Sequence, residues 1–434
     1  MDVARGASLS GDYYSTEGEY IRLTCGNFDY RNNCFKENTS KDNLFYAGAF
    51  KAEFLLEKGD IITPLTEQAI GLLGTTARIP ESGKYIQSQD IALIKCKVGK
   101  IDPTFCYYLI PSRLVRDQLS AAAQQTKIRH TSPDKIKDCT VWIPDLDDQK
   151  AIGRLLASLD EKIQLNKRIN DNLEAMAKQL YDYWFVQFDF PNEDGKPYKS
   201  SGGVMVWNEK LKREIPKGWN TVVIGDILDK YPATKRYETK EYLPQGKYPI
   251  IDQGDSYIVG FTNERENLLV RHPAVLFGDH STKVKFLDFD FARGADGTQI
   301  LYSSIPEVSQ YYLYLALKSM SIPNPGYSRH FKYLKEMPVI TPSIDVAIAF
   351  SEIVTPLYKQ WTNNVFGNIE LTKQRDELLP LLMNGQASIN YHLSELLPIF
   401  CQAVQYHCLC IEYLVRISTL FRSYLLTFLG CLSC

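Results

Sequence analysis

The sequence predicts a mixed α/β protein in which two globular stretches alternate with two long helices. The first observation behind this is a seven-residue spacing of apolar residues that occurs twice, each member lying 198 positions from its counterpart. The second is that a stretch of domain size precedes each helix and contains short β-branched and aromatic runs. The two heptad series are Ile152, Leu159, Asn166, Leu173 and Leu180, and Phe350, Leu357, Asn364, Leu371 and Leu378.

Asn166 and Asn364 interrupt the two apolar stripes at the same heptad. A seven-residue apolar repeat forms the seam of a coiled coil, and one Asn in that seam fixes the register at some cost in stability. We therefore expect the two helices to pair with each other and these two residues to set the register.

Composition limits the class of protein. The chain has 434 residues, 44% of them hydrophobic and 23% charged, which is enough for about two to three domains with their own cores. The net charge of −2 argues against a generally basic nucleic-acid coat, so any DNA contact would come from local patches. No secretory leader is expected, and singly scattered cysteines suit reduced thiols in a cytoplasmic protein: Cys25, Cys34, Cys96, Cys106 and Cys139.

The first half predicts a globular stretch over residues 1–145 followed by a helix over 146–189. Short apolar runs broken by Gly, Pro, Asn and Asp favour strands, and "IDPTFCYYLIPSRLVRDQLSAAAQQT" favours a helix that opens at an Asp-Pro start signal. A second start signal is Pro144 with the acidic residues that follow it. This long helix should extend to about Phe185, a length of roughly 60 Å at about 1.5 Å per residue.

The second half repeats this order. Residues 190–220 are dense in Gly, Pro, Ser and charge, which predicts a loop or linker. A second globular stretch over 221–343 contains strand-like runs and the helix-like "EVSQYYLYLALKSM", and a second long helix covers 344–390. Pro356 lies inside that helix, so we expect a kink or a late helix start there.

Long linked phrases carry a family resemblance. The stretch "IPDLDDQKAIGRLLASLDEKIQLNKRINDNLEAMAKQLYDYWFVQFDF", continued to "IPKGW", and the later "NIELTKQRDELLPLLMNGQ" resemble the specificity subunit of type I restriction-modification systems over about residues 1–390. The resemblance implies two target recognition domains and an antiparallel coiled coil that separates them. It implies a non-catalytic, DNA-binding subunit. Modification subunits would bring S-adenosylmethionine and adenine methylation, and restriction subunits would bring ATP, Mg and DNA cleavage.

The residues themselves point to a compatible function. Two unlike globular domains held apart by a paired helix form a ruler, which on B-DNA sets the spacing between two half-sites. The predicted target is therefore asymmetric and interrupted. The alternative is a coiled-coil scaffold whose domains bind proteins, and a lack of salt-dependent DNA affinity would favour it.

Four polar stretches supply candidate DNA contacts. Lys and Arg bind phosphate, Arg also forks onto guanine, and small polar side chains reach base edges. "RH" recurs at an offset of 200 in "QQTKIRHTSPDKIK" and "PGYSRHFKYLK", while "TPLTEQAIG" and "FGDHSTKVKF" follow apolar runs. Ordinary solvated loops explain any single one of these residues equally well. The candidates are Thr66, Gln68, Lys127, Arg129, His130 and Lys135 in the first half, and His280, Ser281, Lys283, Arg329, His330 and Lys332 in the second.

Catalytic and metal sites are not predicted. No phosphate-binding G-x-x-x-x-G-K-[ST] loop occurs, and the acidic pair at Asp160–Glu161 falls on the predicted coiled coil rather than on nuclease strands. The apolar tail 391–434 contains Cys408, Cys410, Cys431 and Cys434, whose irregular spacing argues against zinc and favours an extra packing or surface helix. The first half begins without a counterpart of "IPKGWNTVVIGDIL", so we expect a shortened start or a recombination boundary.

Overall fold

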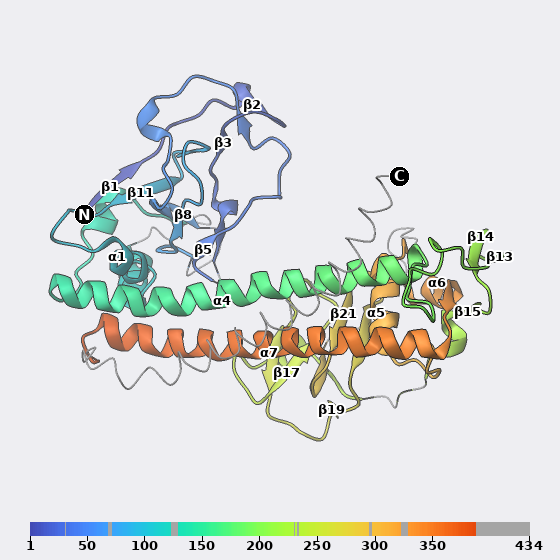
Figure 1. The fold of residues 1–434 in the computed structure, drawn as a ribbon. Coiled ribbons are helices and arrows are strands. Elements are labelled where there is room, and N and C mark those ends of the chain that lie inside the picture. The colour runs from blue at the N-terminus through green and yellow to red at the C-terminus, as the bar shows by residue number, and fades with distance from the viewer. Residues whose placement is uncertain are drawn as a thin grey trace. The chain divides into compact units, whose positions relative to one another are not determined.

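The computed structural model describes residues 1–30, 32–67, 72–122, 129–229, 231, 234–294, 297–322 and 329–387. It separates into two compact units, of which the first holds Met1–Ala157 with the described chain from Arg375 onward. The second unit holds Ser158–Gln374. The unit boundaries fall inside the two long helices, α4 (Leu146–Tyr181) and α7 (Ile344–Met383), so each unit contains part of both (Figure 1).

The described part of the first unit is built on two small sheets. One has the order β1-β11-β7-β9 with antiparallel neighbours, and the other has the order β10-β3-β6-β2. The short pairs β4–β5 and β8–β12 lie beside them. The bounds are β1 Asp2–Arg5, β2 Tyr14–Ser15, β3 Ile21–Arg22, β4 Phe28–Asp29, β5 Cys34–Phe35, β6 Phe45–Tyr46, β7 Ile61–Pro64, β8 Thr66–Glu67, β9 Ala77–Arg78, β10 Tyr85–Ile86, β11 Ile91–Lys95 and β12 Arg129–His130, with 3₁₀ turns at Gly11–Tyr13, Cys25–Asn27 and Ala52–Phe54.

Three helices follow these strands: α1 (Pro103–Leu109), α2 (Arg113–Ala122) and α3 (Pro133–Lys137). The predicted Asp-Pro start is confirmed, because the Asp102 carboxylate accepts hydrogen bonds from the N–H groups of Thr104 and Phe105 at 2.9 Å each. The predicted single helical run is two helices, since Pro111 cannot continue α1. The core of this unit includes α1 together with Ile152 and Leu156 of α4 and Leu382 and Met383 of α7. Because these residues of α4 and α7 are buried in the same core, the first unit includes the start of α4 and the end of α7.

The second unit contains a sheet of order β21-β20-β23 and a larger sheet of order β16-β22-β17-β18, to which β19 adds through β22. Apolar strands such as β20, all of whose residues are buried, form the core between the sheets and α5. The bounds are β16 Arg236–Tyr237, β17 Tyr248–Ile251, β18 Gly260–Thr262, β19 Leu268–Leu269, β20 Ala274–Gly278, β21 Val284–Leu287, β22 Phe291–Gly294, β23 Thr298–Leu301, α5 Gln310–Ser319, α6 Phe331–Glu336 and a 3₁₀ turn at Thr239–Glu241.

The segment 190–220, expected to be a loop or linker, contains a hairpin of β13 (Met205–Asn208) and β14 (Arg213–Pro216). The composition did not predict these strands, because they are short and flank a charged turn, in which Lys212 has a φ of 52°. Directly after them, β15 (Asn220–Val223) pairs antiparallel with β24 (Pro338–Thr341), and a 3₁₀ turn at Ile224–Ile227 packs on α6. Part of the expected linker is therefore ordered structure of the second unit.

Both long helices form as the heptads predict. α4 runs to Tyr181 and continues as one π-helical turn over Asp182–Val186, so the predicted end near Phe185 is confirmed. α7 passes through Pro356 without interruption, so a late helix start is wrong. Proline removes the donor for the carbonyl of Glu352, a residue on the exposed side of the helix.

Within the second unit, the two helices are locked by two Asn pairs. The Asn166 side-chain N–H donates to Asn368 Oδ1 at 2.8 Å, and that of Asn364 donates to Asn170 Oδ1 at 2.8 Å. One pair is the image of the other under the 198-residue offset, and higher numbers on α4 meet lower numbers on α7. The helices are therefore antiparallel. Asn166 and Asn364, singled out from the sequence, are 4% and 7% exposed and lie in these pairs. Their role in setting the register stays a prediction.

No helix among the described residues is both long enough and apolar enough to cross a membrane. The tail 391–434, with its five cysteines, lies outside the described residues.

Candidate nucleic-acid interface

In the first unit, the structure brings two of the predicted polar stretches together. β8 pairs antiparallel with β12, which places His130 opposite Thr66 and Arg129 opposite Glu67. The N–H of Thr131 donates to the carbonyl of Leu65 at 2.9 Å and extends this pairing. His130 is exposed, while the Thr66 hydroxyl lies 3.2 Å from the thiol sulfur of Cys25.

Glu67 is a supporting residue that sequence reasoning missed. It is 2% exposed, and its Oε2 accepts hydrogen bonds from the N–H groups of Leu72 and Leu73 at 2.7 and 2.9 Å. Its carboxylate thus joins the end of β8 to the backbone at Leu72 and Leu73. Gln68 and Lys127 lie outside the described residues, and only the backbone of Arg129 is described.

The basic residues that follow β12 have local partners. The Ser132 hydroxyl caps α3 by accepting the N–H of Lys135 at 3.2 Å. The ammonium of Lys135 donates to the carbonyl of Ala122 at 2.6 Å, and that of Lys137 pairs with Asp134 at 2.7 Å. These contacts fix the start of α3 beside the end of α2. DNA contact by Lys135 stays a prediction.

In the second unit, the turn between β20 and β21 carries His280, Ser281 and Lys283. The N–H of His280 donates to Gln253 Oε1 at 3.0 Å, and the Ser281 hydroxyl donates to the carbonyl of Gln253 at 2.7 Å. Thr282 adopts a φ of 56°, and its N–H closes the turn on the carbonyl of Gly278 at 2.8 Å. The turn therefore has a fixed shape with His280 exposed.

Asp279 joins this turn to the other predicted stretch of the second half. It is 3% exposed; its carbonyl accepts the N–H of His330, and its Oδ1 accepts the N–H of Phe331, both at 2.8 Å. Sequence reasoning missed Asp279 as it missed Glu67, although Glu67 ends the short strand β8 and Asp279 directly follows β20. Arg329 and Lys332 are exposed beside the turn.

His330 differs from the other candidates because it is 1% exposed. Its backbone links to Asp279, and its imidazole Nδ1 has no hydrogen-bond partner among the residues that the structure describes. In this structure the imidazole is buried rather than facing solvent, and it makes no capping hydrogen bond to α6.

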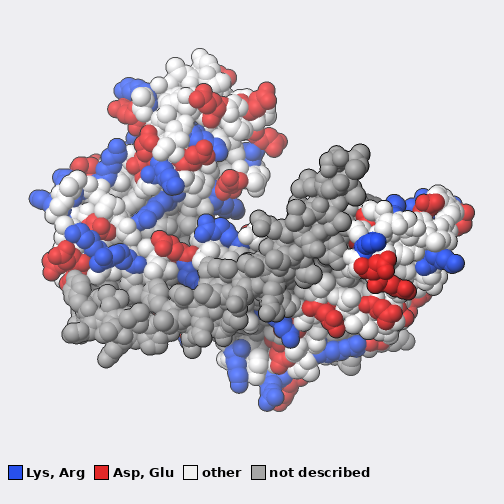
Figure 2. Space-filling view, viewed as in Figure 1, with Lys and Arg blue, Asp and Glu red and all other residues white. Residues whose placement is uncertain are grey.

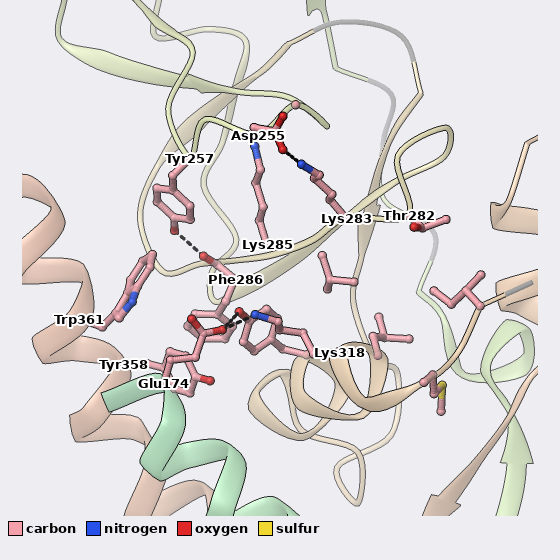
Figure 3. Close-up of a pocket in the computed structure, with 16 residues that line it drawn as sticks. Glu174, Asp255, Tyr257, Thr282, Lys283, Lys285, Phe286, Lys318, Tyr358 and Trp361 are labelled. Atoms are coloured by element: carbon pink, nitrogen blue, oxygen red, sulfur yellow. Dashed lines mark hydrogen bonds and ion pairs between the residues drawn. The ribbon is translucent and has the colours of Figure 1, made fainter. Parts of the chain in front are cut away.

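A cavity of about 470 Å³ lies behind the turn (Figure 3). Lys283, on its rim, pairs with Asp255, and Lys318 pairs with Glu174 of α4 at 2.6 Å. The Tyr314 hydroxyl donates to the same Glu174 carboxylate at 2.6 Å. These contacts connect the sheet and α5 of the second unit to its portion of the helical frame.

Comparison with known proteins decides the family. The chain matches the family described as type I restriction modification DNA specificity domain over residues 11–175 and 216–371. The chain belongs to this family.

Curated relatives are specificity subunits. The type I restriction enzyme MjaIX specificity subunit of Methanocaldococcus jannaschii is 24% identical over 312 residues, covering 66% of this chain and 69% of the relative. The type I restriction enzyme HindI specificity subunit of Haemophilus influenzae is 22% identical over 382 residues, covering 70% and 81%. The crystal structure of a type I restriction-modification S subunit from M. genitalium shares the fold, with a TM-score of 0.52 and 17% identity over 88% of this chain and 93% of that one.

Family membership gives the role. Specificity subunits recognise DNA sequence, are non-catalytic and work in a complex with other subunits and DNA. The prediction of a DNA-reading, non-catalytic chain is therefore confirmed. Among the residues that the structure describes, no group of His, Cys, Asp or Glu side chains is arranged to hold a metal ion.

Charge on the specificity subunit is local. Figure 2 shows Lys and Arg interspersed with Asp and Glu over the described residues of the face in view. This distribution suits recognition by separate short loops, as the net charge of −2 suggests.

Lys285 is the buried cation of the cavity, and it makes stability depend on pH. It is 7% exposed and donates to the carbonyls of Asp252 and Ser256 at 2.7 and 2.6 Å, and burial lowers its pKa from 10.5 to about 8. Between these two pH values the unfolded chain binds more protons, so the free energy of unfolding rises with pH.

We therefore expect the free energy of unfolding of the unchanged chain, measured relative to that of Lys285→Met, to rise by about 1 kcal/mol between pH 8 and pH 9.5. Melting curves of both proteins across this range measure the difference. Parallel pH profiles would contradict a titrating Lys285.

Proposed function

We propose that this specificity subunit reads an asymmetric, bipartite DNA target, one half-site with each globular stretch, while the paired helices set the spacing. One observation carries the proposal. The two long helices repeat at an offset of 198 residues, whereas the candidate DNA-contacting loops of the two globular stretches differ in sequence. The first stretch presents the β8–β12 pair with Thr66 and His130, and the second presents the β20–β21 turn with Arg329 and Lys332 beside it. Unlike reading loops on a repeated frame suit unlike half-sites.

Phosphate contacts orient each recognition domain, and groove contacts specify the sequence. Arg329 and Lys332 are exposed cations for phosphate or guanine, and His280 and Ser281 lie on a shaped turn that fits base edges. In the first half the same roles fall to Thr66, His130 and the neighbouring Gln68, Lys127, Arg129 and Lys135.

Two modification subunits would dock on the helical frame and carry out adenine methylation with S-adenosylmethionine, and restriction subunits would use ATP and Mg. The adenine would be flipped into a pocket of the modification subunit, since the chemistry needs the base out of the stack. The complex would act in the cytoplasm on the cell's own DNA.

The deciding experiment is co-expression with the modification and restriction subunits in a methylation-free host, followed by single-molecule sequencing of the host DNA. A split motif with methyladenine on both strands would support the proposal and reveal both half-sites. A soluble, assembled complex that leaves the DNA unmodified would overturn it.

The phosphate role makes a separate prediction. Arg329→Ala and Lys332→Ala should each lower the slope of log affinity against log salt concentration by about 1, because one phosphate contact is lost. Binding of the assembled complex to its target duplex at several salt concentrations measures this slope. Lys212→Ala is the matched control, since Lys212 is exposed on the β13–β14 turn and pairs with Glu209. An unchanged slope in both test variants would exclude phosphate contact there.

A further inference from the structure

The strand β24, which leads into the second long helix, is covered along one edge. Residues 215–227, called here the edge-covering segment, contain β15, whose Thr221 and Val222 lie opposite Ile340 and Val339. The N–H of Ile224 adds a hydrogen bond to the carbonyl of Met337 at 2.9 Å. With this segment in place, Val339, Ile340 and Thr341 are 2%, 9% and 8% exposed.

The counterpart of β24 in the first half lies open. At the 198-residue offset, Val141, Trp142 and Ile143 correspond to Val339, Ile340 and Thr341, and they too lead through a proline into a long helix. Trp142 is 46% exposed and Ile143 is 41% exposed. Trp142 and Ile143 are thus partly exposed, with the Trp142 ring beside Gly385, at a position that is buried in the other half.

The backbone of this counterpart is also unpaired. No described residue hydrogen-bonds the backbone groups of Val141, Trp142 or Ile143. The neighbouring Thr140 is held by the Gln118 side chain, which accepts its N–H at 2.8 Å and donates to its carbonyl at 2.9 Å. Backbone donors and acceptors next to an exposed apolar pair form a template for an added strand.

We propose that residues 139–143 are a docking edge for an extended segment of a second, different polypeptide with the chemistry of the edge-covering segment. Its backbone pairs with Val141 and Ile143, and its β-branched side chains cover Trp142 and Ile143. A second copy of this chain does not fit, because its own edge-covering segment is already paired with β24.

The acidic residues that follow the docking edge indicate the direction in which the partner segment runs. In antiparallel register, residues before the strand lie beside the start of the long helix, as Lys217 precedes β15. The first half has Asp145, Asp147 and Asp148 at that position, where the second half has Ser343, Asp345 and Val346. The partner segment therefore carries a basic residue ahead of its strand.

A synthetic peptide with the sequence of residues 215–228 serves as the probe, labelled with a fluorophore and titrated with the full chain. We expect saturable binding by fluorescence anisotropy and slower hydrogen exchange at residues 139–143. The control peptide carries Val222→Pro, which removes one strand N–H and leaves the protein unchanged; it should bind at least tenfold more weakly.

The matched protein variants are Ile143→Asp and Val98→Asp. Ile143→Asp should weaken binding at least tenfold, because a carboxylate would be buried under the added strand. Val98→Asp alters a fully exposed apolar residue of the same unit and should bind like the unchanged chain. Unchanged melting temperatures would establish that both variants are folded.

Three results would overturn the proposal. The first is equal binding of the two peptides. The second is faster exchange at residues 220–224 with no protection of 139–143, which would mean that the peptide displaces the chain's own segment from β24. The third is the absence of binding up to about 1 mM, the weakest affinity that such a contact needs to be meaningful. None of these outcomes depends on DNA binding, so this test is independent of the proposed function.

Discussion

Asp279→Ala is expected to abolish recognition of one half-site. The substitution removes the carboxylate that accepts the Phe331 N–H at 2.8 Å, in a residue that is 3% exposed. Losing a buried hydrogen bond to a charged group costs roughly 1.5–3 kcal/mol. That energy holds the β20–β21 turn against the start of α6, so His280 and Arg329 would lose their fixed relation. Because a bipartite target needs both halves, methylation of the whole motif should fail.

The measurement is sequencing of host DNA after co-expression with the modification subunits, together with hydrogen exchange over residues 279–283. Asp279→Asn is the close control, since it retains an oxygen at the same position and should keep part of the activity. Asp255→Ala is the distant control, because this exposed carboxylate pairs only with Lys283 at the rim. Full methylation by Asp279→Ala would show that the turn is not part of the reading surface.

Asn364→Leu is expected to destabilise the second unit by about 1–3 kcal/mol. Asn170 Oδ1 would lose the amide that donates to it at 2.8 Å, and the Gln360 amide would lose its acceptor, also at 2.8 Å. Both losses occur in the helix seam, where Asn170 is 8% exposed. The double variant Asn170→Leu with Asn364→Leu should recover part of the stability, because the seam then no longer buries the Asn170 amide without its Asn364 partner, although the Gln360 amide still lacks its acceptor.

The midpoint of thermal unfolding measures both effects, and the double-mutant cycle gives the coupling between the two side chains. The Asn166–Asn368 pair is a built-in control. It has the same 2.8 Å geometry at the 198-residue offset, so Asn166→Leu should produce a loss of similar size. Additive effects of Asn170→Leu and Asn364→Leu would contradict a direct pairing.

The sequence was sufficient to predict the helical frame but not its contacts. Heptad spacing located both helices and both seam amides, because apolar periodicity reports directly on the buried face. It did not predict that Asn166 meets Asn368 rather than Asn364. In an antiparallel pair, the partner of a seam residue depends on the axial stagger of the helices, and packing of the globular stretches contributes to that stagger.

The candidate site was predicted as separate stretches whose meeting was not foreseen. Thr66 and His130 lie opposite each other, and the turn at His280 contacts His330, since short strands and a buried acid bring them together. Glu67 and Asp279 were not predicted because an acidic residue at the end of a strand usually faces solvent. The imidazole of His330 was expected in a polar loop and is buried, which depends on tertiary packing that no local pattern records.

The two Asn pairs bear on how the gene can exchange one globular stretch by recombination. Each pair takes one member from the helix that follows each globular stretch, and neither pair includes a residue of a reading loop. A crossover that replaces one stretch between the helices therefore keeps both pairs, and the hybrid chain should fold on the old frame. New DNA specificities can then arise by exchange of whole blocks, in one event, without any adjustment of the two long helices.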